Sequence, residues 1–136
     1  MARILGLDYG VKRTGISVTD PLQIIVNPLK VIETINLLDF LFFYIEKEDI
    51  EKIVIGEPIH RDGTEVYFEN DIKTLIKEIN KKYPEILIDR QDESFTSSEA
   101  KDLLLQMNIK KKKRRDKSIL DKMSAVLILQ RYLKHI

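Results

Sequence analysis

Two short runs of strand-forming residues that flank a charged turn open this chain, and they constrain its fold more than any other stretch. Residues 4–7 are apolar, and residues 14–18 alternate between small polar and branched apolar side chains, which predicts two strands joined as a hairpin. The first run ends in Asp8, and the connection carries Gly10, Lys12 and Arg13. This pattern predicts a carboxylate at the end of a buried strand beside two cations, so a metal ion, a phosphate group or both are candidate ligands.

The rest of the chain alternates between strand and helix patterns, over a length of 136 residues that suits one domain spanning residues 1–136. We expect strands at 3–9, 14–19, 24–32, 52–56 and 86–90, and helices at 34–47, 65–82, 96–107 and from Ser118 onward. This order predicts an α/β fold with a five-stranded mixed sheet and helices on both faces. Strands 1, 4 and 5 should be parallel, with strand 2 antiparallel to strand 1.

Two residues carry more specific expectations about packing. Pro28 lies inside the third predicted strand and lacks a backbone N–H, which favours an edge position for that strand. Ile35 recurs at helical spacing with Leu38, Phe42 and Ile45, so we expect it on the buried face of the helix at 34–47.

Acidic residues follow each of the three strands that we expect to be parallel. Asp8 ends strand 1, Glu57 follows strand 4, and Asp92 and Glu93 follow strand 5. Ligand sites of such sheets lie outside the carboxyl ends of the parallel strands. We therefore expect these acids to converge, with Asp92 orienting its neighbours and Glu57 either a ligand or a bystander.

The types of side chain present in this sequence limit which metal ions the protein could bind. There is no cysteine, which excludes disulfides and thiolate sites, and we assign no catalytic role to His60 or His135. Carboxylate oxygens suit Mg²⁺ or Mn²⁺ rather than Zn²⁺.

Charge is divided unevenly along the chain. Residues 1–106 hold 13 basic and 20 acidic residues, whereas residues 107–136 hold 10 basic and 2 acidic ones. Six consecutive cations form what we call the basic run: Lys110, Lys111, Lys112, Lys113, Arg114 and Arg115. A basic segment on an acidic body indicates a polyanionic partner, and we expect the basic run, Lys12 and Arg13 to bind nucleic-acid phosphates.

Four motifs, in order along nearly the whole chain, resemble the YqgF (RuvX) family of the ribonuclease H-like superfamily. They are Asp8-x-Gly-x-Lys-Arg-x-Gly15, Ile55-Gly-x-Pro58 with Asp62-Gly63, Asp92-Glu-Ser-Phe-Thr-Ser97, and Asp121-x-x-Ser-Ala-x-x-Ile-Leu-Gln130. The resemblance implies a ribonuclease H-like fold and a metal-dependent nuclease. It also implies maturation of the small-subunit ribosomal RNA precursor at the 5′ end of pre-16S rRNA, or cleavage of four-way Holliday junctions.

By position in these motifs, the resemblance implies a catalytic and metal-binding triad of Asp8, Glu93 and Asp121. Asp121 also stands at the last position of a capping box that starts at Ser118, and the two roles can coexist. The sequence departs from the family pattern at two positions. Ser94 replaces the usual Arg, which removes a cation beside the triad, and Glu57 replaces a common Leu.

Two other functions remain open at this stage. A sugar-kinase-like ATP-binding protein also begins with an Asp-x-Gly hairpin, but it needs two such domains. A catalytically silent RNA-binding module would not need the acids at 8, 93 and 121. We expect a cytoplasmic monomer or homodimer that binds structured RNA or branched DNA and no membrane, because no apolar run reaches the length of a bilayer span.

Overall fold

The computed structural model describes residues 2–58, 66–92 and 117–135, with the backbone alone for residues 117–121. The elements within these ranges are β1 (Arg3–Asp8), β2 (Arg13–Thr19), β3 (Val26–Glu33), a 3₁₀ turn η1 (Thr34–Asn36), α1 (Leu37–Lys47), β4 (Ile50–Glu57), α2 (Glu69–Lys82), β5 (Leu87–Asp92) and α5 (Lys117–Tyr132). The helix expected at 96–107 and the basic run lie outside the described residues. No described helix is long and apolar enough to cross a membrane.

The strands form one five-stranded sheet in the order β3-β2-β1-β4-β5. The β1–β2 and β2–β3 pairs are antiparallel, whereas β1–β4 and β4–β5 are parallel, which confirms the predicted mixed sheet. Strand β3 lies at one edge, where the missing N–H of Pro28 need not interrupt a ladder on both sides.

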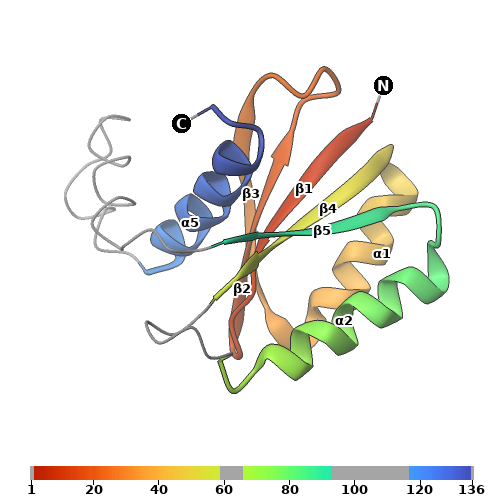
Figure 1. Ribbon diagram of the computed structural model, residues 1–136, viewed down its shortest axis with the longest axis vertical. Helices are drawn as coiled ribbons and strands as arrows, with labels where there is room; N and C mark the ends of the chain where they lie inside the picture. The colour runs from red at the N-terminus through yellow and green to blue at the C-terminus, as the bar shows by residue number, and fades with distance from the viewer. Residues whose placement is uncertain (1, 59–65, 93–116, 136) are drawn as a thin grey trace.

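Helices cover both faces of the sheet, with α1 and α2 on one side and α5 on the other (Figure 1). Alternate residues of the central strands face the two sides. Leu5 and Ile55 belong to the larger core cluster, which includes residues of α1 and α2. Ile4 and Val54 instead pack in a second cluster with Ile128 and Leu129 of α5.

Helix α5 packs directly against β1 at Gly6, which has no side chain to separate them. A Cβ atom at Gly6 would lie 2.5 Å from Cγ of Leu129 and 2.4 Å from Oγ of Ser17. The buried Ser17 hydroxyl donates a hydrogen bond of 2.8 Å to the carbonyl of Ala125. Strand β2 and helix α5 are therefore joined at the point where β1 makes room for the helix.

We expect Gly6→Ala to lower the free energy of unfolding by about 1–3 kcal/mol, the usual cost of overpacking a core. Urea denaturation would measure the loss. The double variant Gly6→Ala, Leu129→Ala should lose less than the sum of the two single variants, because it removes Cγ and Cδ1 of Leu129, two of the three atoms that the new Cβ would crowd. Strict additivity would contradict the close approach.

Two expectations about element boundaries were wrong. Residues 34–36 form the 3₁₀ turn and the α-helix begins only at Leu37, so Ile35 turns outward and is 87% exposed. Helix α2 begins at Glu69 rather than at residue 65. In both cases the helical spacing of apolar residues extends to residues that precede the first residue of the helix. Such spacing defines the boundaries of an element less well than its presence.

Candidate active site

The carboxyl ends of the three parallel strands lie together at one end of the sheet, which we call the site edge. Each of the three strands carries an acid there. Asp8 is the last residue of β1, Glu57 of β4 and Asp92 of β5. Glu57 and Asp92 are register partners, and Leu7 is the partner of Ile55 two residues earlier in β4. The register of the backbone therefore places the three strand ends next to one another along the sheet.

The acids do not all follow the same face of the sheet. Asp8 continues the alternation of Ile4 and Gly6, which meet α5. Glu57 continues the alternation of Ile53 and Ile55, which pack with α1 and α2. Strand alternation thus assigns Asp8 to the α5 face and Glu57 to the opposite one.

Helix α5 runs with its first turns toward the Asp8 edge of the sheet. At its far end the Tyr132 hydroxyl donates a hydrogen bond of 2.7 Å to Asp89 and accepts one of 2.9 Å from Lys52, near the starts of β5 and β4. Near its beginning, Lys122 shares a surface hollow with Arg13 and Glu33. The backbone of Asp121 lies one helical turn before Ala125, on the side of the site edge.

A hydroxyl network fixes the β1–β2 turn that carries the two predicted phosphate-binding cations. Thr34 Oγ1 donates to the carbonyl of Gly10 at 2.6 Å, so the Thr14 hydroxyl, 2.9 Å away, donates to Thr34. The Thr34 backbone N–H also donates to the carbonyl of Lys12 at 2.9 Å. A Cβ atom at Gly10 would lie 2.4 Å from the Arg13 carbonyl oxygen, so the turn requires glycine here.

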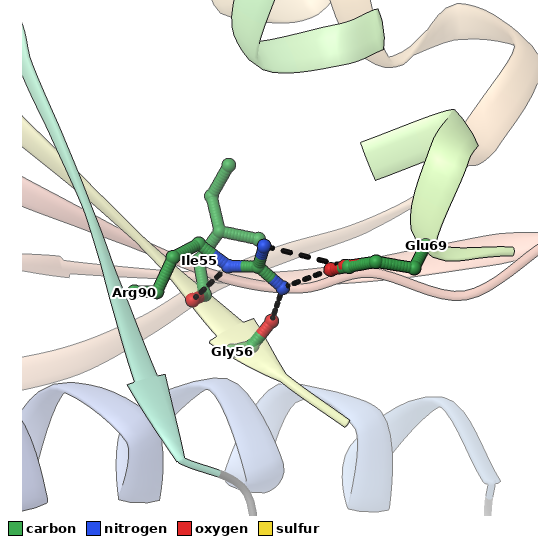
Figure 2. Close-up of polar contacts among 4 residues, drawn as sticks. All are labelled: Ile55, Gly56, Glu69 and Arg90. Carbon is green, nitrogen blue, oxygen red and sulfur yellow. Dashed lines mark hydrogen bonds and ion pairs between the residues drawn. The ribbon is translucent and has the colours of Figure 1, made fainter. Parts of the chain in front are cut away.

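A buried ion pair, which the sequence patterns did not indicate, holds the end of β4 (Figure 2). Nη2 of Arg90 in β5 lies 2.7 Å from Oε1 of Glu69 in α2, and Nη1 donates to Oε2 at 3.4 Å. The same guanidinium donates to the carbonyls of Ile55 at 3.3 Å and Gly56 at 3.0 Å. The Arg90 side chain therefore joins β5, the start of α2 and the two residues of β4 that precede Glu57.

An aromatic row extends from the site edge toward α2. The ring of Tyr9, next to Asp8, stacks on Phe68 with centroids 6.0 Å apart, and Phe68 meets Tyr67 edge-on at 5.2 Å. Partial burial, with the Asp71 carboxylate as a smaller cause, raises the pKa of Tyr9 above its usual value.

Much of the predicted triad lies beyond what the structure describes. Glu93, the side chain of Asp121 and the basic run fall outside it. Among the residues of the described ranges, no three His, Asp or Glu side chains form a group that could hold a metal ion. The assignment of Asp8, Glu93 and Asp121 as metal ligands, with or without Glu57, stays a prediction.

Comparison with known proteins identifies the family of this chain. Residues 2–135 match the RuvX family, described as a Holliday junction resolvase. The chain belongs to the RuvX family. Two similar relatives carry the name "Putative pre-16S rRNA nuclease": that of Christiangramia forsetii is 46% identical over 133 residues, and that of Phocaeicola vulgatus is 44% identical over 134 residues. Each comparison covers 98% of this chain, with 98% and 96% of the two relatives.

The fold of this RuvX-family chain also resembles that of a viral resolvase. The fowlpox virus resolvase, solved in complex with Holliday junction DNA, aligns with a TM-score of 0.65 at 10% identity over 98% of this chain and 97% of the viral one. A second structure of the fowlpox virus Holliday junction resolvase aligns with a TM-score of 0.59. At this level of identity the likeness concerns the fold alone, and it agrees with the predicted α/β architecture.

Proposed function

We propose that this RuvX-family nuclease is a divalent-metal-dependent hydrolase that acts on phosphodiester bonds near the 5′ end of pre-16S rRNA. The observation that carries the proposal is the common edge of the sheet. The parallel strands bring Asp8, Glu57 and Asp92 to this edge, and the first turns of α5, with Asp121, run toward it. We choose RNA as the substrate because the similar relatives carry the name "Putative pre-16S rRNA nuclease".

The donor set at this edge suits a hard cation. All the candidate ligands are carboxylates, which Mg²⁺ and Mn²⁺ prefer. Asp8, Glu93 and Asp121 would hold the metal, which when bound neutralises charge on a phosphate and lowers the pKa of a bound water. The residues of the chain would contribute positioning: Lys12 and Arg13 sit on the fixed turn next to Asp8, and we assign phosphate contacts to them and to the basic run.

A second substrate is favoured by the family description and by the fold. The RuvX family is described as a Holliday junction resolvase, and the viral resolvase shares the architecture over nearly the whole chain. Two symmetric cuts in a four-way junction need two active sites, so this alternative requires a homodimer, whereas processing of one RNA strand does not.

A side-by-side cleavage assay tests the proposal. Precursor 16S rRNA and a synthetic four-way DNA junction would be incubated with the protein and Mg²⁺ or Mn²⁺, with chelator as control. We expect metal-dependent cleavage of the RNA. Cleavage of the junction alone would support resolvase activity, and no cleavage of either substrate with either metal would support a silent RNA-binding module.

The role of Glu57 can be measured separately by calorimetric titration of Mn²⁺. Because strand alternation assigns Glu57 to the α2 face, we expect Glu57→Gln to weaken Mn²⁺ binding less than Asp8→Asn does. An equal loss in the two variants would make Glu57 a full metal ligand.

A further inference from the structure

A groove beside the β1–β2 turn combines cations with exposed apolar side chains. It has a volume of about 1010 Å³ and is lined by Gly10, Val11, Lys12, Arg13, Glu33, Ile35, Tyr67 and Phe68. Tyr67 is 84% exposed and Ile35 is 87% exposed. Large apolar side chains that gather at one hollow of a surface indicate a binding site more often than scattered ones do.

Tyr67 is exposed but well supported from below. Its ring meets Phe68 at an angle of 87°, and Phe68 packs against the main core and stacks on Tyr9. Two residues after Tyr67, the buried carboxylate of Glu69 pairs with Arg90 and anchors the first turn of α2 (Figure 2). The ring is therefore presented to solvent on a held backbone, which lowers the entropy cost of using it for binding.

The charges around the groove indicate the chemistry of its ligand. Lys12 is exposed and, with Arg13, lies on the turn held by Thr34. Glu33, the one acid among the lining residues in the described part of the chain, is the register partner of Arg13. An aromatic face beside cations is the combination by which proteins bind unpaired nucleotides, with the base on the ring and the phosphate on the cation.

We propose that this groove binds an unpaired stretch of the nucleic-acid substrate, with a nucleobase stacked on Tyr67 and the adjoining phosphate on Lys12. The inference rests on the proposed nuclease function and adds a substrate class to it: a single-stranded segment next to the cleavage site. A base inside a duplex is already stacked on its neighbours, so it cannot use the Tyr67 ring without being unpaired.

Binding would be measured by fluorescence anisotropy in the presence of chelator, so that the substrate is not cleaved. The probes are a labelled single-stranded RNA, a single-stranded DNA of the same sequence and the matching RNA duplex. We expect Tyr67→Ala to weaken single-strand binding about 5- to 150-fold, the range for loss of one base–aromatic stack. Duplex binding should change less than about twofold, and Tyr67→Phe should restore the single-strand affinity.

Phe43 offers a matched control, because it is 66% exposed and does not line the groove. Phe43→Ala should leave all three affinities unchanged. Weakening of RNA binding alone, of DNA binding alone or of both would support the groove and show which strand it accepts. Equal affinities in Tyr67→Ala and the unaltered protein would overturn the inference, as would a failure of the unaltered protein to bind either single strand, which would favour a protein partner for this groove.

A second readout separates stacking from charge. The chain has no tryptophan, so Tyr67→Trp would place a single indole in the groove, with Phe43→Trp as control. We expect single-stranded oligonucleotide to quench the fluorescence of the first variant only, and a polyphosphate without bases to quench neither. Quenching by both ligands would overturn base stacking. These readouts need no turnover, so a protein that stacks bases but cleaves nothing would retain the groove and lose the nuclease proposal.

Discussion

Replacing Asp8 with Asn should abolish nucleic-acid hydrolysis while leaving the fold intact. The substitution preserves the shape of the side chain but removes the negative charge that we assign to metal binding. Loss of about 4 kcal/mol of charge stabilisation in the transition state corresponds to a fall of roughly 10³-fold in kcat. Cleavage of precursor RNA under saturating Mg²⁺ measures this fall, and a urea denaturation curve checks stability.

The matched control for this experiment is Asp92→Asn. Asp92 also ends a parallel strand at the same edge of the sheet, but we assign it no metal. Its substitution should change kcat far less than that of Asp8. Full activity of the Asp8→Asn protein would remove Asp8 from the proposed triad, and equal losses in both variants would mean that the edge needs negative charge in general rather than a specific ligand.

The second large effect is expected on stability, at the buried ion pair. Glu69→Gln leaves the Arg90 guanidinium without its carboxylate, although its hydrogen bonds to the carbonyls of Ile55 and Gly56 remain. The side chain of Glu69 is 5% exposed and that of Arg90 is 21% exposed. Breaking one side of such a pair costs about 3 kcal/mol, toward the lower end of the usual range because Arg90 keeps some contact with water.

Urea denaturation of two further variants makes this prediction specific. Glu48→Gln breaks a surface pair in which Nε of Arg3 lies 3.6 Å from Glu48, with both side chains about one-third exposed, and it should cost less than about 1 kcal/mol. The double variant Glu69→Leu, Arg90→Met should be more stable than Glu69→Leu alone, because it leaves no unpaired buried charge. Equal losses from Glu48→Gln and Glu69→Gln would contradict the importance of burial.

The Glu69 variant also connects stability with the site. Because Arg90 holds the last carbonyls of β4 and the start of α2 together, its pair supports both the strand that ends in Glu57 and the turn that presents Tyr67. Loss of the pair should therefore weaken single-strand binding as well as stability, even though neither residue lines the groove.

The sequence by itself determined the succession of the strands along the chain, their relative directions and the acids at their ends. These properties follow from short-range signals. An apolar run of a few residues predicts a strand, a single Pro28 favours an edge, and a helix between two strands requires a parallel crossover. The motifs around Asp8 and Asp121 likewise indicated the RuvX family, because they preserve residue types at fixed spacing.

Only the tertiary structure decided which residues meet. Nothing near Gly6 in the sequence shows that Leu129 packs against it. The strand pattern around Arg90 likewise does not reveal an ion-pair partner in the first turn of α2. Ile35 has the spacing of a buried residue, yet the 3₁₀ turn exposes it in the groove that Tyr67 also lines. The physical reason is that periodicity reports the local backbone, whereas close approach, ion pairing and exposure depend on how elements distant along the chain pack against each other.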